Sequence, residues 1–298
     1  MKKNLFIMAV AAITLTLGAC SNEKENNEPQ AAPKYITVST QISGRTTIAN
    51  DGTQVFANGD KISVYAWTGT ATEIPSSLVV NNSINSYDGT KWTATPQMLW
   101  KDMTSAHYFL SVYPQKAITD FKSDAYTLDV ANQEGSDLLV ATNVTGQTAT
   151  NAPVPLQFDH IMAKLVINLT FRNQWGGTPT VTSVVAQAVK TATVNYLTKA
   201  VTPGSDIANI LMPVTADNTK YSSVMVPQST TFNTIIIEIN GTSYSYYDGK
   251  GISLQSGKIT TVNLIVGRDT ITLGDVSINN WTEGSTINGG EAHEGLIG

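Results

Sequence analysis

Apolar and polar residues alternate along most of the chain beyond residue 34, in short runs with a period of two. The first run, residues 35–42 (YITVSTQI), places four side chains on one face of an extended segment: Ile36, Val38, Thr40 and Ile42. Similar runs, rich in Val, Ile, Thr and Tyr, recur at residues 62–66, 108–112, 126–130, 181–189, 193–197, 207–212, 221–226, 234–239, 260–266 and 270–279. No window keeps a helical period over three turns, so the pattern predicts an all-β fold.

Turn signals separate these runs and divide the chain into two halves. Asp88-Gly89 and Asn240-Gly241 predict tight hairpins, because Asn, Asp and Gly tolerate the positive φ of such turns. Residues 143–153 (NVTGQTATNAP) form the best candidate loop between the halves. Many short strands joined by turns are typical of β-sandwiches, so we expect one sandwich over residues 34–155 and a second over residues 156–298.

The N-terminal residues follow a different pattern, which predicts export. A basic start (MKK) precedes an apolar run over residues 5–17 and a small pair, Gly18-Ala19, as in a signal peptide spanning residues 1–19. The run is shorter than the ~20 apolar residues of a membrane span. Leu17-Gly18-Ala19-Cys20 resembles the bacterial lipobox, in which the cysteine is diacylated and becomes the new N-terminus. The alternative is an ordinary secretory signal with an incidental cysteine.

Cys20 is the only cysteine of the chain, so it cannot form an internal disulfide, and lipidation gives it a use. The polar residues 20–33 (CSNEKENNEPQAAP) cannot bury enough apolar surface to fold, and we expect them to form a disordered tether. Acyl chains on Cys20 would then anchor the mature protein to a membrane without spanning it.

Composition and charge argue against several classes of function. Charged residues make up only 14% of the chain, and the net charge of −5 includes no basic stripe, which argues against nucleic-acid binding. The three histidines, His107, His160 and His293, lie far apart in the sequence and do not form a pattern of metal ligands. We expect His160 to be a hydrogen-bonded structural residue. No nucleophile, phosphate-loop or dinucleotide motif occurs, so we predict no enzyme, no catalytic or metal-binding residues and no cofactor. Two carboxylates converging in space remain open as a last alternative.

Aromatic residues admit two interpretations. They could form a platform on which sugars stack, or they could fill the sandwich cores, which we favour because strands are generally rich in aromatics. The residues concerned are Trp67, Trp92, Trp100, Trp175, Trp281, Tyr244, Tyr246 and Tyr247.

Several loose motifs occur in an order that resembles the fimbrillin family, the type V pilin lipoprotein precursors and Mfa-like proteins of Bacteroides-type bacteria. They are the lipobox, Arg45-Thr46 after the first run, FxxGDxIxVYA at residues 56–66, Tyr113-Pro114, SDLLVA at 136–141, VxLxFxHxxAKL at 154–165 and IxxWxxG at 278–284. The resemblance spans essentially the whole chain and implies two tandem transthyretin-like β-sandwich domains in a fimbrial subunit or adhesin. It also implies a lipid anchor in the outer membrane through Cys20 and a place at the cell surface, in a fimbrium.

The resemblance further implies assembly by strand exchange. In the family, an arginine-specific protease cuts after the first strand, and a strand from the C-terminal region of another subunit fills the resulting groove. Here the cut would fall between Arg45 and Thr46, although Arg45 can also be a plain surface arginine. The donor residues would be Ile271, Leu273, Val276 and Ile278, with Gly274 allowing a shift between the two pairs. A host or bacterial receptor or glycan is a further expected partner, and a surface glycan-binding lipoprotein is the alternative function.

Overall fold

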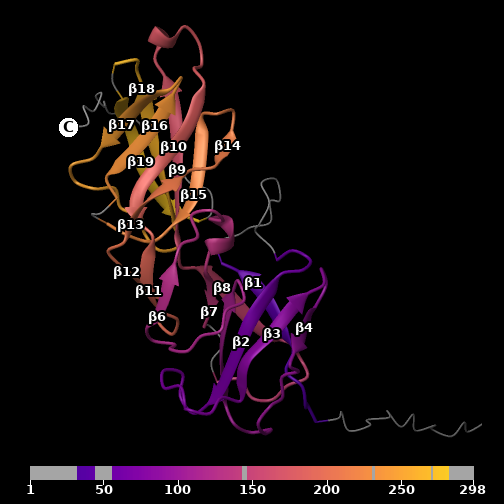
Figure 1. Ribbon diagram of the computed structural model, residues 1–298. Helices are drawn as coiled ribbons and strands as arrows, with labels where there is room; N and C mark the ends of the chain where they lie inside the picture. The colour runs from indigo at the N-terminus through magenta and orange to yellow at the C-terminus, as the bar shows by residue number, and fades with distance from the viewer. Residues whose placement is uncertain (1–31, 44–55, 143–145, 230–231, 270, 282–298) are drawn as a thin grey trace, which may run out of the picture. The chain divides into compact units, whose positions relative to one another are not determined.

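The computed structural model describes residues 32–43, 56–142, 146–229, 232–269 and 271–281 (Figure 1). These residues form strands β1 to β19 and two short 3-10 segments, η1 (Glu134–Ser136) and η2 (Asn173–Trp175). The predicted all-β fold is confirmed. None of the helical segments in the described ranges is long and apolar enough to cross a membrane.

The largest sheet has seven strands in the order β1-β8-β7-β5-β2-β3-β4. β1 runs parallel to β8, and every other neighbouring pair in this sheet is antiparallel. The strands are β1 (Val38–Ile42), β2 (Lys61–Thr68), β3 (Val80–Tyr87), β4 (Trp92–Thr95), β5 (His107–Tyr113), β7 (Leu139–Ala141) and β8 (Val154–His160). β1 and β4 are therefore the two edges of this sheet.

Three smaller sheets complete the described part of the chain. A five-stranded sheet has the order β14-β15-β9-β18-β19, a four-stranded sheet has β13-β10-β16-β17, and a three-stranded sheet has β12-β11-β6. Their strands are β6 (Asp124–Thr127), β9 (Ala163–Phe171), β10 (Val181–Val189), β11 (Thr191–Asn195), β12 (Ala200–Pro203), β13 (Ile207–Leu211), β14 (Val214–Ala216), β15 (Lys220–Met225), β16 (Thr234–Ile239), β17 (Thr242–Tyr247), β18 (Lys258–Val266) and β19 (Ile271–Asn280). The pairing of β6 with β11 joins segments from both halves of the sequence.

Both predicted hairpins are present. β3 and β4 are joined through residues 88–91, which begin with Asp88 and Gly89, and the φ of Gly89 is 91°. β16 and β17 are joined through Asn240 and Gly241, whose φ values are 50° and 80°. Positive φ at both central residues is what a type I′ turn requires, and Asn-Gly adopts it at little cost.

Alternating side chains of β2 enter two hydrophobic clusters, which we call the small core and the large core. Ile62 and Val64 lie in the small core, while Tyr65 and Trp67 lie in the large core with side chains from the four- and five-stranded sheets. The buried residues of the small core are Ile36, Val38, Phe56, Ile62, Val64, Ala66, Val80, Trp92, Met98, Trp100, Phe109, Leu139, Ala141, Val154, Leu156 and Phe158. The period of two is thus visible as burial on both faces of β2.

Candidate functional site: the first and last strands

β1 is an edge strand whose ladder partner is β8, in a register that places Val38 opposite Val154 and Ile42 opposite Phe158. Backbone hydrogen bonds extend this pairing at both ends, from Val154 N to Thr37 O (2.8 Å) and from Ser43 N to Phe158 O (2.6 Å). The edge position matters because such a strand can leave a sheet after breaking one ladder instead of two.

The residues just before β1 are held by a different segment. Ile36 N donates to Met98 O (3.0 Å), and Trp100 N donates to Lys34 O (3.2 Å). Tyr35 and Leu99 form an antiparallel bridge between these two hydrogen bonds. The whole first segment, from residue 34 to residue 43, is therefore bonded to the rest of the chain along its length.

The inner face of the first segment closes the small core. Ile36 and Val38 are buried there, at 2% and 6% exposed, and Ile42 packs against the same cluster. Thr40 lies on this face too, and its Oγ1 accepts a hydrogen bond from Trp92 Nε1 (3.0 Å). The face predicted from the sequence is confirmed. Burial of a Val or Ile side chain contributes about 1.5–3 kcal/mol.

Aromatic rings lie in the part of the small core that contains β1. The Phe56 ring meets the Trp92 ring edge-on, with centroids 5.1 Å apart, and meets the Phe158 ring in the same way at 5.3 Å. Phe158 lies opposite Ile42 of β1 in the ladder, and Trp92 donates a hydrogen bond to Thr40 of β1. This segment of the sheet is therefore apolar and well packed.

β19, which contains the expected donor residues, is also an edge strand and pairs antiparallel with β18. Leu273 lies opposite Leu264, and Val276 lies opposite Val262. Paired residues share a face in an antiparallel ladder, so both point toward the large core, against which they pack. Ile271 is fully buried on the same face, and Ile278 is 38% exposed.

A β-bulge at Gly274 produces this arrangement. The register shifts between Val262 and Leu264, so the single residue Asn263 lies opposite two residues of β19, Gly274 and Asp275. A Cβ at Gly274 would lie 2.6 Å from Asn263 O, which excludes any other residue without a backbone shift. The shift predicted at Gly274 is confirmed.

The opposite face of β19 is polar and nevertheless buried, through Thr272, Asp275 and Ser277. Thr272 Oγ1 accepts a hydrogen bond from a guanidinium nitrogen of Arg172 (2.9 Å). Removal from water raises the pKa of the Asp275 carboxyl.

The other residues singled out in the sequence lie partly outside the described ranges. Cys20, Arg45, Thr46 and His293 are outside them, so lipidation and processing stay predictions. His160 is a hydrogen-bonded structural histidine as expected, with its Nδ1 2.7 Å from Asp137 Oδ2. The described residues contain no group of three side chains arranged to hold a metal.

Most of the aromatic residues considered as a sugar platform are buried instead. The buried residues are Trp67, Trp92, Trp100, Trp281, Tyr244 and Tyr246, while Trp175 is half-buried. Tyr247 is 67% exposed. The core interpretation therefore holds for the set as a whole.

The model of the fimbrillin-like family (Mfa_like_1) matches residues 45–281. The chain belongs to the fimbrillin-like family. This confirms the resemblance seen in the sequence, and the family match covers the seven-stranded sheet from β2 onward and all three smaller sheets.

Solved structures show the same fold. A candidate cell adhesion protein from Bacteroides ovatus is 18% identical, with a TM-score of 0.67, over 85% of this chain and 100% of that one. A candidate cell adhesion protein from Bacteroides uniformis is 16% identical (TM-score 0.64; 83% and 99% covered), and a fimbrial protein from Bacteroides vulgatus is 13% identical (0.51; 84% and 100%). No curated protein sequence matches the chain.

Proposed function

We propose that the chain is a fimbrial subunit or adhesin that assembles with other subunits by strand exchange. The fimbrillin-like family supports the fimbrial role. The observation that carries the assembly step is the position of the first segment: β1 is an edge strand, and Ile36 just before it and Val38 within it are buried in the small core. In this proposal the seven-stranded sheet holds the acceptor groove, and β19 at the edge of the five-stranded sheet supplies the donor.

Cleavage between Arg45 and Thr46 would free the first segment from the chain. Its loss would expose the apolar side chains around Trp92 and Phe158 and would leave the backbone of β8 without a ladder partner on that side. A groove that combines apolar pockets with unpaired backbone groups is a template for an added strand. An extended segment with alternating apolar residues would restore both interactions.

Residues 270–278 are the proposed donor in the neighbouring subunit. Ile271, Leu273, Val276 and Ile278 share one face, as a strand entering the groove requires. β19 must first leave β18, its one partner in the described sheet, and this cost has to be recovered in the groove of the acceptor. Contacts of this head-to-tail kind do not close on themselves and so produce fibres.

The precursor would reach the cell surface as a lipoprotein. Acyl chains on Cys20 would anchor it in the outer membrane before assembly, because two chains suffice for stable attachment. Its partners are then membrane lipid, other pilin subunits and a receptor on a host or bacterial surface.

An arginine-specific protease tests the assembly step. We would treat the folded protein with the protease under native conditions, identify the cut by mass spectrometry and follow size by light scattering. A cut after Arg45, loss of residues 34–45 and growth of fibres or ladders are expected. A cut product that stays monomeric, or that keeps its first strand bound, would overturn the strand-exchange proposal.

Two variants sharpen this experiment. Arg45→Ala should resist the cut and remain monomeric. Ile278→Ser changes a partly exposed donor residue, so it should fold and be cut normally but assemble more slowly. If Ile278→Ser assembled at the normal rate, residues 270–278 would not be the donor, although the proposal for the acceptor groove would stand.

A further inference from the structure

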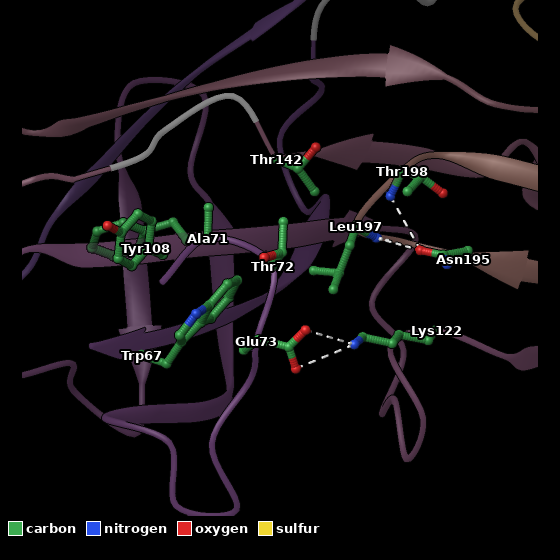
Figure 2. Close-up of a pocket in the computed structure, with 11 residues that line it drawn as sticks. Trp67, Ala71, Thr72, Glu73, Tyr108, Lys122, Thr142, Asn195, Leu197 and Thr198 are labelled. Carbon is green, nitrogen blue, oxygen red and sulfur yellow. Dashed lines mark hydrogen bonds and ion pairs between the residues drawn. The ribbon is translucent and has the colours of Figure 1, made fainter. Parts of the chain in front are cut away.

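A cavity of about 380 Å³ lies between the end of β2, the start of β5 and the turn that joins β11 to β12 (Figure 2). Its lining includes Trp67 and Tyr108 on one side and Leu197 on the other. No lining residue belongs to β1 or β19, so the cavity is separate from the elements proposed for strand exchange. We propose that this cavity binds a neutral saccharide residue.

The aromatic side of the cavity is rigid. The rings of Trp67 and Tyr108 are 26° from parallel, with centroids 6.2 Å apart. Trp67 Nε1 donates a hydrogen bond to Thr70 O (2.7 Å), which fixes the indole against the loop that follows β2. Trp67 is buried and supports the half-buried Tyr108, which is the ring that a ligand can reach. A supported aromatic face of this kind can pack against the apolar C–H face of a pyranose ring.

Neutral polar groups surround this apolar surface. Asn195 Oδ1 accepts hydrogen bonds from Leu197 N and Thr198 N, both at 3.1 Å, which fixes the turn and leaves Asn195 Nδ2 with no partner among the described residues. The hydroxyls of Thr72, Thr142 and Tyr108 likewise have no hydrogen-bond partner among the residues that the structure describes. These groups can donate to or accept from the hydroxyls of a sugar.

The charges at the cavity cancel. Glu73 and Lys122 are the charged residues of the described lining, and they form an ion pair at 3.4 Å, visible as the dashed lines in Figure 2. Their side chains are 77% and 53% exposed, so the pair is weak and can separate to hydrogen-bond a ligand. A strongly anionic or cationic ligand would gain little here, which favours a neutral one.

The volume of the cavity limits the size of the ligand. Small-molecule sites usually measure about 300–1,000 Å³, with apolar walls and a few well-placed polar groups. This cavity lies at the small end of that range, which suits one sugar residue at the end of a glycan. A chain that belongs to a surface fimbria would use such a site to hold glycans. This inference goes beyond the proposed assembly, and saccharide binding is measured on the uncut chain, so the two proposals can fail separately.

The test is a titration of the uncut chain with neutral monosaccharides. D-galactose, D-mannose, D-glucose, L-fucose and N-acetyl-D-glucosamine would be added in turn and followed by saturation-transfer NMR and calorimetry. At least one should bind saturably. If none of them binds, or if only charged sugars such as sialic or glucuronic acid bind, the proposal is wrong.

Variants locate the binding. Thr72→Trp fills the cavity from an exposed loop position, and Tyr108→Ala removes the reachable ring, so each should weaken binding by about tenfold or more. Tyr247→Ala removes an exposed tyrosine on β17, outside the cavity lining, and should leave affinity unchanged. Equal affinity in Thr72→Trp and the original chain would show that the sugar binds elsewhere and would overturn the assignment of this cavity.

Discussion

The imidazole of His160 stacks on the indole of Trp281, with ring centroids 4.0 Å apart and planes only 11° from parallel. His160 ends β8, the strand beside β1, and Trp281 directly follows β19. The bond from His160 Nδ1 to Asp137 Oδ2 holds the imidazole in position. This contact connects β8, the ladder partner of β1, to the residue that follows the proposed donor strand β19.

Trp281→Ala should destabilise the protein strongly. Trp281 is 7% exposed, and loss of a buried Trp side chain costs about 3–5 kcal/mol in free energy of unfolding. Urea unfolding followed by circular dichroism would measure the loss. Trp281→Phe keeps an aromatic ring and should cost less, whereas Tyr247→Ala at an exposed position should cost almost nothing. A near-neutral Trp281→Ala would mean that the stack does not hold β19.

Strand positions could be predicted from the sequence because the alternation that encodes them is local. β10 (Val181–Val189) and β16 (Thr234–Ile239) begin and end where the apolar pattern does. Strand partners could not be predicted in this way. The parallel pairing of β1 with β8 and the pairing of β6 with β11 join residues far apart in the chain, and a period of two carries no information about which strand lies next to which.

The same contrast holds for the functional residues. The shared face of Ile271, Leu273 and Val276 could be predicted because it depends only on the alternation and on Gly274. The cavity could not, because Trp67 and Leu197 come from distant segments and neither belongs to a recognisable motif. The stack of His160 on Trp281 is similarly a product of tertiary packing.

Gly274→Ala should weaken the pairing of β18 with β19. The added methyl would meet Asn263 O at 2.6 Å, and overpacking of this kind costs about 1–3 kcal/mol in free energy of unfolding. Hydrogen exchange of the β18 and β19 amides would localise the effect. Gly249→Ala is the matched control, because a Cβ there has only an ordinary contact at 3.9 Å with the Tyr247 ring. Equal stability of the two variants would contradict the close approach at Gly274.

Tyr196→Phe should remove one of two hydrogen bonds to a partly buried carboxylate. Asp124 Oδ2 accepts from Tyr196 OH (2.7 Å) and from Lys116 Nζ (2.5 Å). Burial, together with the bond to Asp124, raises the pKa of the Tyr196 hydroxyl, so the hydroxyl remains a donor at neutral pH. The expected loss is about 0.5–1.5 kcal/mol in free energy of unfolding by urea titration.

The control for Tyr196→Phe is Tyr87→Phe, whose hydroxyl has no hydrogen-bond partner within the described ranges. It should change stability by less than about 0.5 kcal/mol. In the background of Asp124→Asn, Tyr196→Phe should cost less than it does alone, since the charged acceptor is gone. Additive losses would show that the two side chains do not interact.

Protonation of His107 should lower the free energy of unfolding as the pH falls. Its neutral ring satisfies two bonds, since Nδ1–H donates to Ser105 O (2.9 Å) and Nε2 accepts from Lys101 N (3.1 Å). Burial lowers the pKa of His107 below its ordinary value, although the nearby charge of Asp102 acts in the opposite direction. Protonation would place a second N–H against the amide of Lys101.

The sign of the effect follows from proton binding in the two states. Below about pH 6.5 the unfolded chain binds a proton at His107 while the folded chain does not. The free energy of unfolding therefore decreases as the pH is lowered, by at most about 1.4 kcal/mol per pH unit. Urea midpoints at neutral and mildly acidic pH would measure this slope, and His107→Gln, which cannot titrate, should flatten it. Because the two proteins differ only at residue 107, the difference between the two slopes reports His107 alone. Parallel slopes would show that His107 is free to protonate in the folded protein.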